Sequence, residues 1–196
     1  MPTIREIAGL PETPAKLSQS ALIMIDCQNT YRDGIMRLEG VEDALQNASQ
    51  LLQRARKASI PIFHIQHDAG VGSPYDLTAT NGQIADLVAP ADAESVIVKR
   101  YPDSFASTDL DDQLKAAGCK NVILAGFMSH MCVSSTARGG FDRGYAVSVV
   151  ENTTATRELP DGHGGTIPAS EVQRASLRGL ADLVAIIVDD ATAIPD

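Results

Sequence analysis

The 196-residue sequence has no tryptophan, and aromatic residues make up only 4% of it. So few rings argue against a base-stacking surface for single-stranded nucleic acid. Basic residues are also scarce, because 16 Lys and Arg stand against 25 Asp and Glu, for a net charge of −9. A surface of this sign repels a phosphate backbone. Nucleic acid is therefore not an expected partner.

Long apolar runs are missing as well. No stretch reaches the roughly 18 consecutive apolar residues that mark a membrane span. The first twenty residues lack the charged, apolar and small segments of a signal peptide. The three cysteines, Cys27, Cys119 and Cys132, have no metal-like spacing and favour a reducing compartment. We therefore expect a cytoplasmic protein without a membrane partner.

The length and a hydrophobic content of 44% fit a single globular domain over residues 1–196. Residues 1–20 contain three prolines and no regular apolar spacing, which predicts an irregular N-terminal arm. Beyond the arm, short apolar runs alternate with segments of helical spacing. The predicted strands are 21–26, 60–68, 95–100, 121–127, 146–152 and 183–188. The predicted helices are 41–59, 107–118, a segment ending near residue 144, and 168–182.

This alternation predicts an α/β protein with a three-layer α-β-α, Rossmann-like fold. Six apolar strands separated by helices indicate a mainly parallel six-stranded sheet with helices on both faces. A capping box from Thr108 to Asp111 is expected to start one helix and Gly118 to end it. Pro168 is expected in the first turn of the last helix. Ligands of such sheets bind beyond the carboxyl ends of the strands, where the strand order reverses.

Reactive side chains follow several of these strands. Asp26 follows the first, His67 and Asp68 the second, and Lys99 the third, while Cys132 begins a helix after the fourth. Only a thiolate attacks well, and a helix N-terminus and a nearby lysine both favour it. Asp26 would accept the thiol proton and return it to a leaving amine. The set predicts a nucleophilic cysteine site.

Each of these residues also has an ordinary interpretation. A cysteine in a first helical turn is often a small packing residue, and an acid after a strand is often a helix cap. A lysine at a strand end often faces water. No glycine-rich nucleotide motif and no G-x-S-x-G elbow follows a strand. The glycine-rich segment Asp161–Gly165 is interpreted as a flexible loop, and spacing alone leaves the choice open.

Three segments, in order, resemble the isochorismatase-like cysteine hydrolases. They are "LIMIDCQNTY", "VIVKRYPDSFASTDLDDQL" and "LAGFMSHMCVSSTARGGFDRGYAVSVVENTTAT". The family includes nicotinamidases, N-carbamoylsarcosine amidohydrolase, ureidoacrylate amidohydrolases and streptothricin hydrolase. The resemblance extends over residues 21–188 and implies a catalytic triad of Asp26, Lys99 and Cys132. It also implies a cis peptide between Phe127 and Met128, and an oxyanion hole formed by the N–H groups of Met128 and Cys132.

The activity implied by the resemblance is hydrolysis of a C–N bond in a small amide, carbamoyl or cyclic amide substrate, through a thioester and without a cofactor. Nicotinamidases bind a metal through an Asp-x-His pattern, which "HIQHDAG" lacks, so no metal is expected. Family members are commonly homodimers or homotetramers. The segment 70–79 is a candidate loop for completing a neighbouring subunit's site.

Six further residues are candidates for lining the substrate pocket, with general packing as the alternative for each. They are Tyr31, His67, Asp68, Phe105, Ser129 and His130. Two other functions remain open: isochorismatase-type ether hydrolysis, and a non-catalytic redox or binding role on the same fold. Cys132 argues against the first, because true isochorismatases resemble this fold but have no cysteine there. The complete triad argues against the second.

Overall fold

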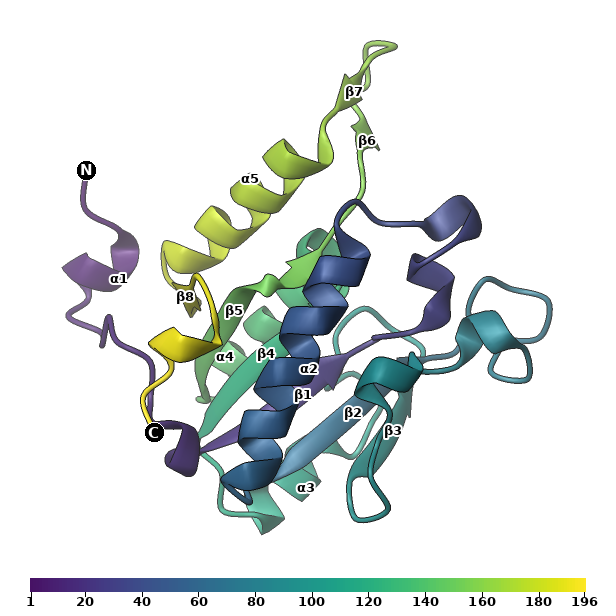
Figure 1. Cartoon of the computed structure of the whole chain (residues 1–196). Coiled ribbons are helices and arrows are strands. Elements are labelled where there is room, and N and C mark those ends of the chain that lie inside the picture. The colour runs from purple at the N-terminus through teal and green to yellow at the C-terminus, as the bar shows by residue number, and fades with distance from the viewer.

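A six-stranded sheet forms the centre of the molecule (Figure 1). The computed structural model describes all 196 residues. The strands are β1 (Ser20–Ile25), β2 (Ile62–His67), β3 (Ser95–Lys99), β4 (Asn121–Phe127), β5 (Ala146–Ala155) and β8 (Ala185–Val188). They lie in the order β3-β2-β1-β4-β5-β8, and every neighbouring pair is parallel. The predicted mainly parallel sheet is confirmed, with all six strands in one direction.

Helices cover both faces of this sheet. On one face lies α2 (Val41–Lys57), whose buried residues recur every three or four positions. The other face is covered by α3 (Leu110–Ala116), α4 (Ser134–Asp142) and α5 (Ala169–Ala181). Two separate apolar cores result, one on each side of the sheet. No helix has both the length and the hydropathy needed to cross a membrane.

The strand order reverses between β1 and β4. The chain runs from β1 outward to β3 on one side, and then from β4 outward to β8 on the other. Gly126 of β4 pairs with Ile25 of β1 at this junction. Its φ is +114°, and a Cβ on it would lie 2.0 Å from the Ile25 carbonyl oxygen. Only glycine fits there, so the ends of β1 and β4 lie in direct backbone contact.

Two capping predictions are wrong. Helix α3 begins at Leu110 with Asp109 as its N-cap, and no side chain caps it. The Thr108 hydroxyl instead donates to the Ser104 carbonyl at 2.6 Å, so a competing local hydrogen bond replaces the expected capping box. Pro168 has ψ 148° and is the N-cap of α5, one position before its first turn.

The arm expected to be irregular contains regular structure. It includes the short helix α1 (Ile4–Ile7), which Thr3 and Glu6 cap reciprocally. The glycine-rich segment 161–165 is a loop, as expected, and it joins β6 (Leu159–Pro160) to β7 (Thr166–Ile167) in a two-stranded hairpin. This hairpin projects from the body of the protein before α5 begins (Figure 1).

Candidate active site

The carboxylate, ammonium and thiol predicted from the strand ends lie together. Asp26 follows β1, Lys99 ends β3, and Cys132 lies in a π-helical turn, Ser129–Val133, between β4 and α4. Lys99 Nζ is 2.7 Å from Asp26 Oδ2, and both side chains are fully buried. The Cys132 thiol is in hydrogen-bonding reach of both groups and is itself buried. The fold thus brings together three chemically different groups from three separate segments.

The backbone is unusual on either side of the switch between β1 and β4. Asp26 has a φ of +48°, a left-handed conformation that is uncommon outside glycine. Its N–H donates to the Ile65 carbonyl at 3.0 Å, which ties it to β2. The π-helical turn that carries Cys132 is a rare form found mostly at functional sites. Both irregularities occur at the points where the sheet presents these side chains.

The peptide bond between Phe127 and Met128 is cis, at the position indicated by the family resemblance. Met128 is 6% exposed, and its N–H donates to no backbone or side-chain acceptor in the protein. Buried N–H groups almost always have a partner. The Met128 N–H is therefore available to a ligand atom.

Burial and the charges of the neighbouring groups together set the pKa values of the three side chains. Burial raises the pKa of Asp26, even though the charge of Lys99 opposes this. Burial and the charge of Asp26 raise the pKa of Cys132 to about 12, despite the opposing effect of Lys99. Burial lowers the pKa of Lys99, but the charges of Asp26 and Cys132 outweigh it, so the net shift is upward. At neutral pH the site holds a neutral thiol beside a charged lysine.

Lys99 lowers the pKa of Cys132 as expected, but its effect is outweighed. Desolvation of Cys132 and repulsion from Asp26 are larger than the attraction of Lys99. The thiol needs a base when it attacks, and Asp26 is well placed to be one. Burial keeps the Asp26 carboxylate basic, because desolvation outweighs the opposing contacts of Lys99 and Cys132.

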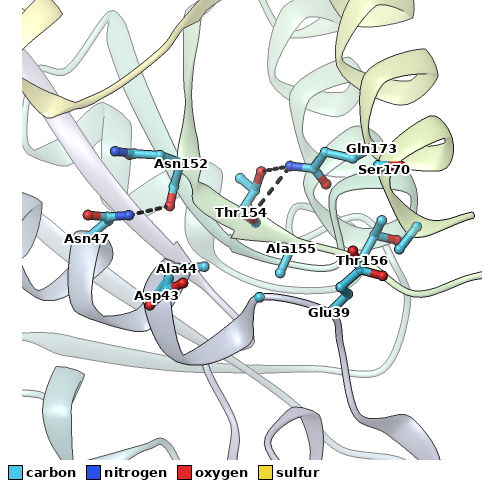
Figure 2. Close-up of a pocket in the computed structure, with 12 residues that line it drawn as sticks. Glu39, Asp43, Ala44, Asn47, Asn152, Thr154, Ala155, Thr156, Ser170 and Gln173 are labelled. Carbon is cyan, nitrogen blue, oxygen red and sulfur yellow. Dashed lines mark hydrogen bonds between the residues drawn. The ribbon is translucent and has the colours of Figure 1, made fainter.

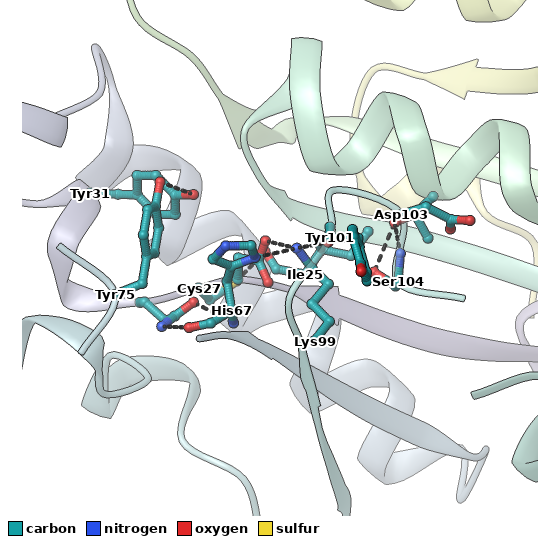
Figure 3. Close-up of polar contacts among 12 residues, drawn as sticks. Ile25, Cys27, Tyr31, His67, Tyr75, Lys99, Tyr101, Asp103 and Ser104 are labelled. Carbon is teal, nitrogen blue, oxygen red and sulfur yellow. Dashed lines mark hydrogen bonds and ion pairs between the residues drawn. The ribbon is translucent and has the colours of Figure 1, made fainter. Parts of the chain in front are cut away.

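Lys99 is oriented by two groups besides Asp26. Its ammonium donates to His67 Nδ1 at 3.2 Å and to the Tyr101 carbonyl at 3.1 Å. Figure 3 shows these residues around the Lys99 side chain. The structure thus places His67, a candidate for the substrate pocket, in contact with Lys99.

Two tyrosines lie beside the triad. The Tyr31 and Tyr75 hydroxyls are 3.2 Å apart, and the His67 ring meets the Tyr75 ring edge-on at 4.8 Å (Figure 3). Burial raises the pKa of both tyrosines, and the charges of Asp26 and Cys132 add to it. Tyr75 belongs to the 70–79 segment, so this loop contributes to its own subunit's site. The sequence offered no periodic signal for Tyr75.

Gln28 is a second residue that sequence reasoning missed. It is fully buried, its Nε2 donates to the carbonyls of His67 and Gly82, and its Oε1 accepts from the His67 N–H. Gln28 therefore clamps the carboxyl end of β2 beside the triad. Its place in the D-x-Q motif after β1 was the available signal.

Ser129 and His130 lie on the far side of Cys132. The Ser129 hydroxyl donates to Gln173 Oε1, and Gln173 Nε2 donates to Thr154 Oγ1 at 2.6 Å. His130 Nδ1 lies 2.6 Å from Thr156 Oγ1. Figure 2 shows Gln173 reaching from α5 toward Thr154 at the wall of a cavity of about 330 Å³. No triad residue lines this cavity.

Asp68 and Phe105 contact residues outside the triad. The carboxylate of Asp68 pairs with Arg100 at 3.1 Å and accepts from the Gly70 N–H at 2.9 Å. Phe105 stacks on Tyr145 within the core, with ring centroids 5.8 Å apart. We assign the first to a surface ion pair and the second to packing, in place of the pocket roles expected from their chain positions.

His64 is buried and contacts a group outside the triad. His64 Nε2 lies 2.8 Å from Glu94 Oε2, which in turn pairs with Arg56. Nowhere do three or more His, Cys, Asp or Glu side chains gather in an arrangement suited to a metal ion.

Comparison with known proteins places this site in a family. The isochorismatase domain model matches residues 20–192. The crystal structure of an isochorismatase from Pseudomonas putida superposes with a TM-score of 0.95 and 36% identity, covering 99% of both chains.

Two curated relatives match over nearly the whole chain. The secreted isochorismatase effector Isc1 of Verticillium dahliae is 34% identical over 96% of this chain and 97% of its own length. Streptothricin hydrolase of Streptomyces noursei is 34% identical over 94% of this chain and 74% of its own. The similarity extends through all the segments that form the site. The chain belongs to the isochorismatase family of hydrolases.

Proposed function

We propose that the protein hydrolyses a C–N bond in a small amide, carbamoyl or cyclic amide, with Cys132 as nucleophile and a thioester intermediate. The observation that carries this proposal is the buried ion pair of Lys99 and Asp26 against the Cys132 thiol. The names of two kinds of relative point the same way: streptothricin hydrolase, and ureidoacrylate amidohydrolases that are 25–29% identical.

In the first half of the reaction, Asp26 takes the proton from Cys132 as the sulfur attacks the substrate carbonyl carbon. The carbon–sulfur bond forms, and the carbonyl electron pair moves onto oxygen. The Met128 and Cys132 N–H groups stabilise this oxyanion. A thiol with a pKa of about 12 requires such a base, because it is not ionised beforehand.

In the second half, the oxyanion collapses and the C–N bond breaks. Asp26 gives its proton to the departing nitrogen, which leaves as ammonia or an amine. Asp26 then takes a proton from water, which attacks the thioester carbon. The carbon–sulfur bond breaks, the thiol is restored, and the acid is released. Lys99 keeps its proton throughout and balances the charge of Asp26.

Ammonia release from a panel of small amides and carbamoyl compounds tests this proposal. We expect Cys132→Ala to abolish release, by at least about 10³-fold. The matched control is Cys119→Ala, which removes a partly exposed thiol remote from the triad and should leave the rate unchanged. Acid-quenched wild-type enzyme should carry an acyl group on Cys132 by mass spectrometry. Equal rates in wild type and Cys132→Ala would contradict the cysteine mechanism.

Isochorismate belongs in the same panel. Its hydrolysis by Cys132→Ala at the wild-type rate would instead favour ether hydrolysis, the activity named for the Pseudomonas putida relative.

Two further expectations stay predictions. We expect a homodimer or homotetramer, and light scattering on the purified protein measures the molar mass that tests this. A cytoplasmic location is to be measured by cell fractionation, and the name of the Verticillium relative describes a secreted protein.

A further inference from the structure

We propose that His67 is a positioning residue, whose unprotonated Nδ1 accepts a hydrogen bond from Lys99 and so directs the ammonium toward Asp26. Its catalytic consequence rests on the proposed amide hydrolysis. The contact itself does not depend on that function.

Three acceptors surround Lys99 Nζ. Asp26 Oδ2 is nearest at 2.7 Å, followed by the Tyr101 carbonyl at 3.1 Å and His67 Nδ1 at 3.2 Å. The ion pair with Asp26 supplies the strongest attraction, and it acts over a wide range of angles. A hydrogen bond weakens steeply off axis, so the contacts with His67 and Tyr101 restrict the direction of the ammonium. The orientation of the ammonium is therefore set by Asp26 together with Tyr101 and His67.

The contact defines the protonation of His67. A lysine ammonium only donates, so Nδ1 must hold a lone pair and the ring proton must sit on Nε2. A doubly protonated ring would place an N–H and a second positive charge 3.2 Å from Lys99. The hydrogen bond would then be lost and the ammonium repelled from its position.

His67 is held firmly in this place. It pairs with Lys99 in the register between β2 and β3, so the two side chains leave neighbouring strands side by side. Gln28 binds both its N–H, at 2.9 Å, and its carbonyl, at 3.0 Å. Tyr75 supports the ring edge-on. Gln28 therefore fixes the main chain of His67, and Tyr75 packs against its ring.

The groups that face the ring favour its neutral form. Burial lowers the pKa of His67, and the charge of Lys99 lowers it further, while Asp26 and Asp68 act in the opposite direction. Tyr75, the remaining titratable neighbour, is neutral near pH 7 because its own pKa is raised. His67 therefore accepts from Lys99 at neutral pH. As the pH falls through its pKa, the acceptor is lost and activity falls with it.

Two substitutions separate this role from simple packing. In His67→Asn the side-chain oxygen takes the place of Nδ1 and accepts without titrating, whereas His67→Leu fills space and accepts nothing. We expect His67→Leu to lower kcat about 10- to 100-fold with a smaller change in KM, since one hydrogen bond to a charged group is lost. We expect His67→Asn to recover most of the rate and to extend activity to lower pH. The control His64→Asn removes the other buried histidine of β2 and should keep the wild-type acid limb.

A measurement independent of activity completes the test. In ¹⁵N-labelled enzyme, NMR should find His67 neutral with its proton on Nε2 at pH 7. A proton on Nδ1, or equal losses and an unchanged acid limb in both His67 variants, would overturn the proposal. If Cys132→Ala keeps full activity while the His67 tautomer is as expected, the proposed function fails and the contact stands.

Discussion

Strand β2 contributes a histidine to each of two charge clusters, and only one of the clusters combines a base with a nucleophile. In the first, Glu94 accepts two hydrogen bonds from Arg56 at 2.7 and 2.8 Å, one from the Ala91 N–H at 2.9 Å, and lies 2.8 Å from His64 Nε2. The Arg56 hydrogen bonds are the main reason that the pKa of Glu94 is lowered to about 2. Such a carboxylate has no tendency to take a proton near neutral pH.

The second cluster lies around His67, three residues further along β2, and the pKa of its acid is shifted in the opposite direction. Asp26 is fully buried, and its close contacts are the Lys99 ammonium and the Cys132 thiol. Burial raises its pKa. Hydrogen bonds to the charged form stabilise a carboxylate, and desolvation makes it basic. The two acids differ in which effect is larger: desolvation outweighs the contacts of Lys99 and Cys132 at Asp26, whereas the hydrogen bonds of Arg56 outweigh desolvation at Glu94.

Neutralising each acid in turn tests most directly whether Asp26 and Glu94 differ in their effect on catalysis. Asp26→Asn should lower kcat/KM for the amide identified in the panel by about 10²- to 10⁴-fold, because the general base is lost. Glu94→Gln should leave kcat/KM within about threefold, because Glu94 contacts no triad residue. Both rates come from the same ammonia assay. Similar losses of kcat/KM in the two variants would contradict the assignment of Asp26 as the general base.

A smaller effect is expected on the Cys132 thiol. The charge of Asp26 helps to raise the pKa of Cys132 to about 12, so Asp26→Asn should lower this pKa. Alkylation of Cys132 at pH 8, followed by mass spectrometry, should then be faster in Asp26→Asn than in wild type, although hydrolysis is lost. Glu94→Gln should alkylate at the wild-type rate. Slower alkylation in Asp26→Asn would contradict the assigned electrostatics.

The smallest effect concerns stability. Glu94→Gln should lower the free energy of unfolding at pH 7 by about 1–3 kcal/mol, since hydrogen bonds to a charged group are weakened. Because the pKa of Glu94 is lowered, its contribution is full above its ordinary value of 4.5 and is lost as the pH falls toward about 2. Calorimetry from pH 7 to pH 3 should show the gap between variant and wild type closing. A gap independent of pH would point to packing alone.

Most of the architecture could be predicted from the sequence because it depends on local periodicity. The apolar runs and the spacing in 41–59 predicted the sheet and α2 within a few residues. The positions of Asp26, Lys99 and Cys132 followed from strand ends and from the family resemblance. What could not be predicted depends on contacts between distant segments. Tyr75 lies in an irregular loop whose path no periodicity describes, so nothing in the sequence placed it beside Tyr31.

The protonation states of the site could not be predicted from the sequence either. The sequence placed Cys132 near a helix terminus and a lysine, and both favour a thiolate. The opposing influence is the depth of burial, which follows from the packed loops and not from any motif. The capping box predicted at Thr108 is absent for a similar reason, because the Thr108 hydroxyl donates to the Ser104 carbonyl.

The backbone contact at Gly126 has a consequence for how this enzyme can be altered. Asp26 follows Ile25 directly, and the loop that carries Cys132 follows the strand of Gly126, so the spacing between base and thiol is set where two main chains touch. No side chain lies between them at that point. Substitutions in the surrounding loops can therefore reshape the substrate pocket while the distance between base and nucleophile stays the same. The fold separates the part that sets reactivity from the part that sets substrate choice, and redesign of specificity can begin with the loops.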